Sequence, residues 1–188
     1  MSIFDKLKNN VLSTAEKAVN SFRSERETFT FSGLPESLAQ LQSLPEADLS
    51  NPFKTAALSL CALCAYAADK QIGIEMLNWL KGPSPLSNQE ISFLDDRFRD
   101  GKTYIPFSYF NGAVPENNYS PTQPFTVTFY TNPYSDAEQG YKKLFVDCGG
   151  ADSPREIVLR MRGDGKWFLW EQFLLVGIRE PKAADPWA

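Results

Sequence analysis

Histidine is absent from the chain of 188 residues. Its absence excludes the catalytic systems that need an imidazole: Ser-His-Asp and Cys-His nucleophiles, His acid–base pairs and His-ligated zinc sites. Basic residues are not in excess either, because 19 Lys and Arg stand against 23 Asp and Glu, giving a net charge of −4. A nucleic-acid-binding domain usually carries a basic surplus or a basic stripe, so we expect no nucleic acid among the partners.

Cysteine is scarce, with only Cys61, Cys64 and Cys148. A small, odd number does not build a disulfide framework and is typical of a reducing compartment, so we expect a cytoplasmic protein. Cys61 and Cys64 have C-x-x-C spacing, but they fall well inside an apolar helical pattern and not at a helix N-terminus, where a thiolate is stabilised. Two buried thiols are therefore favoured over redox or metal chemistry, and we predict neither a metal nor another cofactor.

Long hydrophobic runs are also missing. The most apolar stretch, Ala56–Ala68, is shorter than the roughly 20 residues that a membrane span needs, and residues 1–24 lack the apolar region of a secretory signal. The chain as a whole is 43% hydrophobic and 13% aromatic, which is enough to build a packed core. We expect an N-terminal segment, residues 1–26, followed by a single α+β domain over residues 27–188.

The N-terminal segment has a helical repeat, in which apolar residues recur at steps of three and four and polar residues fill the opposite face. The apolar stripe consists of Phe4, Leu7, Val11, Ala15, Ala18 and Phe22. Four basic and two acidic residues in 1–23 give a side-chain charge of +2. We predict an amphipathic helix that contacts a partner protein or a second copy of the chain. Peripheral contact with an anionic membrane is the alternative.

Helical signals dominate up to about residue 100, after a short alternating stretch, Glu27–Phe31, that favours a strand. Asn51 followed by Pro52 is typical of a helix start, and Ser87-x-x-Glu90 is a capping box that starts another helix. The predicted helices cover Pro35–Leu44, Pro52–Ala68, Ile72–Leu80 and a segment from Ser87 to about Gly101.

Strand signals follow, at residues 125–131, 141–148, 157–162 and 166–171, with a further apolar piece at 173–178. Tyr104–Phe110 is a candidate edge segment, because Pro106 cannot donate a hydrogen bond to a neighbouring strand. Short loops between successive strands, including Gly163-Asp164-Gly165, predict antiparallel pairing. We therefore predict an α+β fold in which N-terminal helices pack on a C-terminal antiparallel sheet of about four to five strands, preceded by the amphipathic helix.

A candidate ligand site lies where the long loop 111–124 would overhang this sheet. A loop of that length without its own secondary structure is often functional. Arg160 and Arg162 share a strand face, and beside aromatic rings they could hold a carboxylate or a phosphate, although ladder charges on a solvated face are the plainer account. The candidate ligand-binding residues are Asn117, Asn118, Tyr119, Arg160 and Trp170.

Six short stretches together resemble an uncharacterised bacterial family, a domain of unknown function. They are Asn51–Leu58 (NPFKTAAL), Tyr109–Ala113 (YFNGA), Pro115–Tyr119 (PENNY), Gly150–Arg155 (GADSPR), Trp167–Glu171 (WFLWE) and Asp185–Trp187 (DPW). The resemblance covers about residues 28–187. It implies a bacterial, intracellular, single compact domain, and it brings no activity, ligand or catalytic residue.

Two functions fit these observations. The first is a non-enzymatic cytoplasmic binding or scaffolding protein, attached through its N-terminal helix to a partner, to a second copy or to a membrane surface. The second is a small-molecule-binding or enzymatic domain with its site beneath loop 111–124. A packed loop without a concave pocket would count against the second, and a deep pocket with convergent polar groups would favour it.

Overall fold

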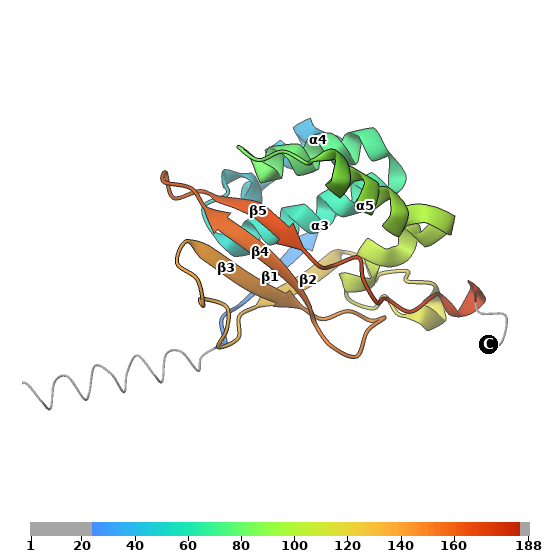
Figure 1. The fold of residues 1–188 in the computed structure, drawn as a ribbon. Coiled ribbons are helices and arrows are strands. Elements are labelled where there is room, and N and C mark those ends of the chain that lie inside the picture. The colour runs from blue at the N-terminus through green and yellow to red at the C-terminus, as the bar shows by residue number, and fades with distance from the viewer. Residues whose placement is uncertain (1–23, 185–188) are drawn as a thin grey trace, which may run out of the picture.

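A computed structural model describes the chain from Ser24 to Ala184. The predicted N-terminal helix, with Phe4, Leu7, Val11 and Phe22, lies outside the described residues, as does the Asp185–Trp187 stretch. The described part has the predicted α+β architecture. A layer of helices covers one face of a five-stranded antiparallel sheet (Figure 1).

The sheet is a meander in the order β1-β2-β3-β4-β5, with every neighbouring pair antiparallel. The strands are β1 (Arg26–Phe31), β2 (Phe125–Tyr130), β3 (Tyr141–Val146), β4 (Arg155–Met161) and β5 (Trp167–Gln172). The whole helical layer is inserted between β1 and β2. The predicted strand at residues 27–31 is therefore an integral edge of the same sheet.

Four α-helices form the covering layer within the described residues: α2 (Leu38–Ser43), α3 (Pro52–Ala68), α4 (Lys70–Lys81) and α5 (Asn88–Phe98). All four begin with a side-chain cap, and Ser37 caps α2. Asn51 caps α3, Asp69 caps α4, and Ser87 with Glu90 forms the predicted capping box of α5. These caps satisfy backbone N–H groups that a helix start leaves without partners.

Two predicted strand segments have other structures. Tyr104–Phe110 falls largely within the 3₁₀ segment η2 (Arg99–Tyr109), where local turns replace sheet pairing around Pro106. Residues 173–178 form turns, which the body of the domain holds in place. The Tyr109 hydroxyl donates to the Leu174 carbonyl, and Arg155 donates to the carbonyls of Val176 and Gly177.

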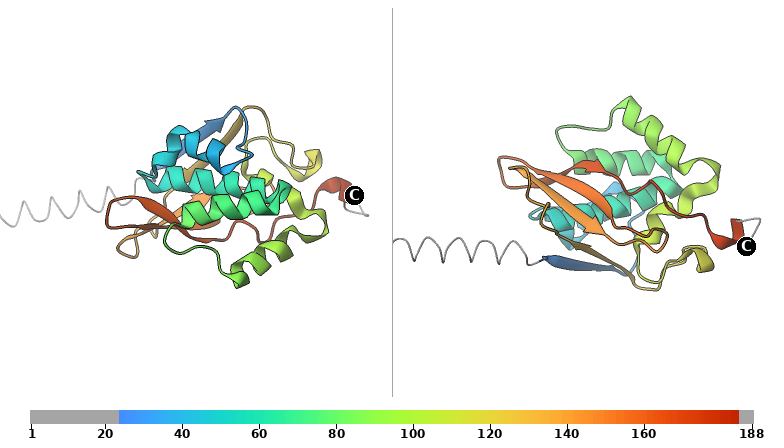
Figure 2. Two further views of the ribbon diagram at one scale, coloured as in Figure 1. Left: turned by 90° about the horizontal axis from the view of Figure 1, so that it is seen from above. Right: turned by 60° about the horizontal axis from the view of Figure 1, so that its bottom comes forward.

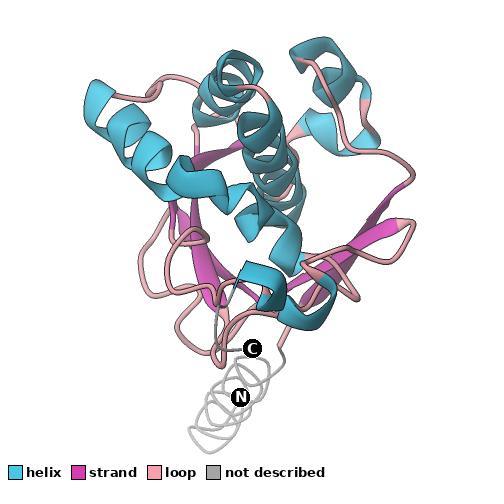
Figure 3. Cartoon of the chain, turned by 90° about the vertical axis from the view of Figure 1, so that its right-hand side faces the viewer, coloured by secondary structure: helices cyan, strands magenta, loops and turns pink. Residues whose placement is uncertain are grey.

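The core lies between α3 and the concave face of the sheet. Helix α3 is buried on nearly all sides and contacts β2, β3, β4 and β5, while α4 packs against both α3 and β5. Figures 2 and 3 show the sheet curving around this helical layer. Cys61 and Cys64 are buried free thiols on α3, as predicted, and burial raises the pKa of each.

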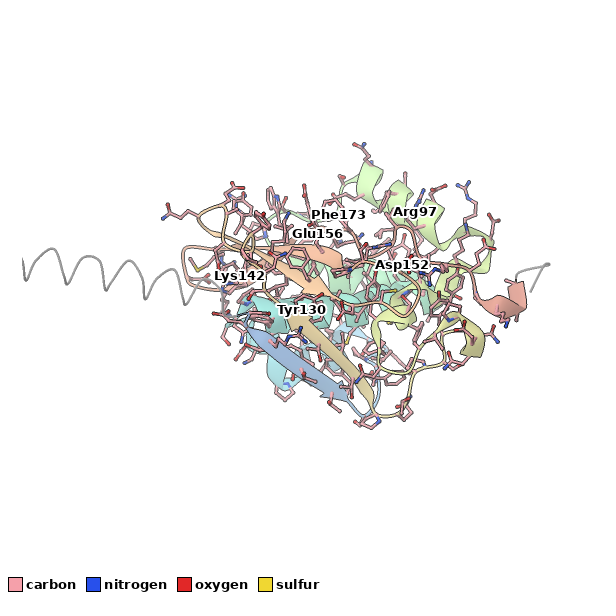
Figure 4. The ribbon with its side chains drawn as sticks, turned by 90° about the horizontal axis from the view of Figure 1, so that it is seen from below. Arg97, Tyr130, Lys142, Asp152, Glu156 and Phe173 are labelled. Atoms are coloured by element: carbon pink, nitrogen blue, oxygen red, sulfur yellow. The ribbon has the colours of Figure 1, made fainter. Side chains whose placement is uncertain are left out.

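The convex face of the sheet carries no helix of the described chain. Its β1–β2 half is a threonine ladder, in which Thr28 and Thr128 hydrogen-bond across the strands at 2.8 Å. Its other half carries half-buried aromatic side chains, among them Phe145, Phe168 and Trp170. Figure 4 looks onto this face, with Tyr130 and Glu156 labelled on β2 and β4.

Candidate functional site

Two adjoining pockets lie along β5, where α4, the loop after it and α5 meet that strand. The leucine pocket, of about 390 Å³, is lined mainly by apolar side chains, including Leu63, Leu77, Leu86, Leu94, Phe93 and Phe173. The basic pocket, of about 370 Å³, is lined by Lys81, Arg160, Arg162, Phe168, Trp170 and the 83–84 turn. The two share Lys81, Leu169 and Trp170, so we call them together the Lys81 cleft.

Lys81 lines both pockets and is itself buried, with 7% of its surface exposed. Its Nζ lies 2.9 Å from Glu90 Oε1 on α5 and donates to the Trp170 carbonyl of β5 at 3.2 Å. A buried lysine is stable only when its charge has such partners. Lys81 thereby links α4, α5 and β5 at the centre of the cleft.

Glu90 has two roles at this point. Its carboxylate completes the α5 capping box with Ser87 and also pairs with Lys81. Burial raises the pKa of Glu90, but hydrogen bonds from Lys81 and Ser87 outweigh it and hold that pKa below its usual value. The Glu90 carboxylate is therefore ionised at neutral pH.

Gly82 brings the basic pocket close to the strand. It ends α4 with φ +56°, a left-handed conformation that favours glycine, and a Cβ at this position would overlap the Phe168 ring. The chain can therefore turn at Gly82 and run directly over β5. Pro83 and Ser84 follow and form one wall of the basic pocket.

A β-bulge shapes the other wall. Val158 pairs with Glu171 and Leu159 with Leu169, so Trp170 is the extra residue on β5. Its ring lies 4.6 Å from the Arg160 guanidinium carbon and packs edge-on against Tyr141, at a centroid distance of 5.7 Å. The bulge thus places Trp170 beside Arg160 at the pocket.

The outer edge of β5 is already engaged by the domain. The backbone N–H of Trp167 donates to the Leu49 carbonyl, and the Trp167 carbonyl accepts from the Thr55 hydroxyl. Lys81 donates to the Trp170 carbonyl. These contacts use backbone groups through which another strand would add to the sheet. The cleft therefore offers side chains, and not free strand-pairing groups, at this edge.

The predicted site beneath loop 111–124 is not assembled. Asn117 donates to the carbonyls of Gly112 and Ser120, and its side-chain oxygen accepts from Val114 and Ser120 N–H groups. Asn118 is exposed with φ +54° and ends a 3₁₀ turn. These polar groups shape the loop itself.

Tyr119 is packed inward, with 2% of its surface exposed. Its hydroxyl donates to the Arg179 carbonyl, its ring stacks on Tyr104 at 5.1 Å, and burial raises its pKa to about 12. The loop packs against Gly149 and Gly150, where an added Cβ would overlap Ala113 or Tyr119 respectively. This contact precedes β4, whereas Arg160 lies near the other end of that strand. Asn117 and Tyr119 therefore do not join Arg160 and Trp170 in one site.

Lys81 and Glu90 were not among the predicted site residues. The capping box correctly marked the start of α5, but nothing near Lys81 in the sequence indicates that its side chain crosses to β5. A lysine at a helix C-terminus is usually solvated. No helix between Ser24 and Ala184 is long and apolar enough to cross a bilayer, and no group of three or more Cys, Asp or Glu in that range is arranged to hold a metal.

Comparison with known proteins identifies a family without assigning an activity. The model of the family described as Domain of unknown function (DUF6935) matches residues 33–182. No curated protein and no solved structure matches the chain. The matched range includes α2 to α5, strands β2 to β5 and both pockets of the Lys81 cleft. The chain belongs to the DUF6935 family.

Proposed function

We propose that this protein is a non-enzymatic binding module of the bacterial cytoplasm whose ligand occupies the Lys81 cleft. The observation that carries the proposal is the juxtaposition of an apolar pocket and a cationic pocket that share one buried lysine. Volumes of about 390 and 370 Å³ fall within the range of ligand pockets, roughly 300–1,000 Å³. The cleft suits a small amphiphilic molecule.

The apolar side supplies most of the expected affinity. Phe93 and Phe173 line the leucine pocket, and their exposed fractions are 40% and 43%. A ligand that covers them removes apolar surface from water, at about 25 cal/mol per Å² before the costs of association are subtracted. The raised pKa values of the buried α3 thiols keep them protonated, so the proposal gives them no nucleophilic role.

The neutral fluorescent probe N-phenyl-1-naphthylamine tests the apolar half of the cleft. We expect its emission to rise on binding to the wild-type chain, and L86W to weaken binding about tenfold because an indole at position 86 fills the leucine pocket. L38W is the matched control, since Leu38 is a half-buried leucine on α2 that lines neither pocket. Equal binding by all three proteins would contradict the assignment.

Attachment through residues 1–23 is the second proposed activity, favoured by the amphipathic stripe of that segment. We expect the full chain, but not a chain that begins at Glu25, to self-associate or to bind vesicles containing anionic lipid. Light scattering with and without such vesicles measures both properties. Identical behaviour of the two proteins would contradict attachment and would leave the cleft proposal intact.

A further inference from the structure

The three cations of the basic pocket differ in how their charges are balanced. Lys81 is paired with Glu90, and Arg162 is paired with Asp164 in the β4–β5 turn. Arg160 makes neither an ion pair nor a side-chain hydrogen bond with any residue from Ser24 to Ala184. No carboxylate is among the residues that line this pocket. After pairing, one positive charge remains, and it belongs to Arg160.

Aromatic rings hold the Arg160 guanidinium in place. Its central carbon lies 4.6 Å from the centre of the Trp170 ring and 5.3 Å from that of Tyr141. These contacts are made by cation–π attraction, which leaves the N–H groups available to an acceptor. Because the side chain is exposed yet packed on two rings, binding an acceptor costs less rotamer entropy than it would for a solvated arginine.

The rest of the pocket wall suits an apolar body attached to that acceptor. Phe168 lies opposite Arg160 across the strands, beneath the Arg162 guanidinium at 4.7 Å. Met161 is 46% exposed, and Pro83 completes the wall. An anionic group at Arg160 would therefore leave its apolar or aromatic carrier against Phe168, Met161 and Pro83.

We propose that the basic pocket binds a carboxylate or phosphate carried on an apolar or aromatic body, with Arg160 as the residue that receives the anion. This inference rests on the proposed binding function and names the chemical class of its ligand. An arginine fork binds two oxygens of one carboxylate or phosphate at once, and a lysine does not. The chain as a whole has a net charge of −4, so recognition depends on this local arrangement and not on overall attraction.

Titration of the full-length, ¹⁵N-labelled protein with phenyl phosphate tests the proposal, with benzoate, inorganic phosphate and phenol as parallel probes. We expect phenyl phosphate or benzoate to shift the amides of Gly82, Ser84 and residues 160–170, and the stronger of the two identifies the anion. Phenol lacks the charge and inorganic phosphate lacks the ring, so each is expected to bind at least tenfold more weakly. Added salt is expected to weaken binding of the anionic probes.

Three variants assign the effect to Arg160. R160Q is expected to weaken binding of the anionic aromatic probe at least tenfold, and R160K to recover only part of that loss because lysine lacks the planar fork. R26Q is the matched control and is expected to stay within twofold of wild type. Arg26 also lies over a ring, Tyr130 at 4.8 Å, but outside the pocket. Arg160 is exposed, so R160Q is expected to unfold at the wild-type temperature.

The outcomes separate this inference from the proposed function. If R160Q binds phenyl phosphate and benzoate as wild type does, or if R26Q loses as much affinity as R160Q, the anion assignment is overturned. Binding of N-phenyl-1-naphthylamine to the leucine pocket would then still support the cleft. If none of the probes shifts the amides of Gly82, Ser84 or residues 160–170, the anion assignment is overturned. If N-phenyl-1-naphthylamine also fails to bind, both the anion assignment and the cleft proposal are overturned.

Discussion

Replacing Gly73 with alanine is expected to destabilise the protein by about 3 kcal/mol or more, or to prevent folding. A Cβ at Gly73 would overlap the backbone of Tyr66, because only Asp69 separates α3 from α4 and the two helices pack closely. In an exposed helix the same substitution would stabilise by about 1 kcal/mol, since alanine has the higher helix propensity. A loss of stability in G73A, and not a gain, would therefore indicate that α3 and α4 pack closely at Gly73.

Gly33 provides the matched control for this substitution. Nothing lies within 4 Å of a Cβ built at Gly33, so G33A is expected to remain within about 0.5 kcal/mol of wild type. Urea unfolding followed by tryptophan fluorescence measures both variants. Wild-type stability of G73A would show that α4 does not approach Tyr66 as closely as described.

Replacing Phe129 with alanine is expected to lower the free energy of unfolding by about 3–5 kcal/mol. Phe129 on β2 is fully buried and belongs to the core cluster on the helix-covered face of the sheet. The substitution removes most of an aromatic side chain from a close-packed core and leaves a cavity that the surrounding elements fill only in part. Thermal and urea unfolding of the two proteins give the difference.

Phe145 on β3 is the matched control for Phe129. It is half-buried and lies on the opposite, convex face, beside Tyr130 at a ring-centroid distance of 6.3 Å. F145A is expected to cost about 1 kcal/mol, because most of what is lost is one aromatic contact and partial burial. If the two variants lose the same stability, the assignment of the concave face as the core face is contradicted.

The secondary structure could be predicted in large part because its signals are local. Asn51 with Pro52, and Ser87 with Glu90, mark helix starts by chemistry that acts within four residues, and both helices begin there. A repeat of two residues in the sequence pattern indicated the strands in the same way. The 3₁₀ segment around Pro106 was missed, because an aromatic-rich stretch beside a proline fits either an edge strand or a series of tight turns.

The site depends on contacts that no local pattern indicates. Lys81 contacts Glu90 on the next helix and Trp170 on a strand far along the chain. The alternation of side chains between the two faces of a strand does not reveal the bulge that places Trp170 beside Arg160. The alternation of side chains along a strand did predict that Arg160 and Arg162 share a face, and in the structure Arg160 lies over Trp170 and Arg162 over Phe168. Two of the five predicted ligand residues, Arg160 and Trp170, therefore line the candidate cleft.

The length of loop 111–124 and its lack of regular secondary structure predict a ligand-binding loop, but a loop that only packs on the domain has the same features. Asparagine and tyrosine are typical of binding loops, but the same side chains can satisfy the backbone of a long loop that packs on the domain. Asn117 does so through four hydrogen bonds, and Tyr119 donates its hydroxyl to the Arg179 carbonyl while it packs against Gly150. Only the packing partners, which are distant in sequence, distinguish the two roles.

The central claim is that the Lys81 cleft holds an amphiphilic ligand, and backbone amide shifts on adding 8-anilinonaphthalene-1-sulfonate test it most directly. This probe joins an aromatic body to an anionic group, so it matches both halves of the cleft. We expect the changes to gather at residues 81–86, 90–94 and 160–173, with little change in loop 111–124. Changes that gather on loop 111–124, or that leave the amides around Lys81 and Trp170 unaffected, would contradict the account.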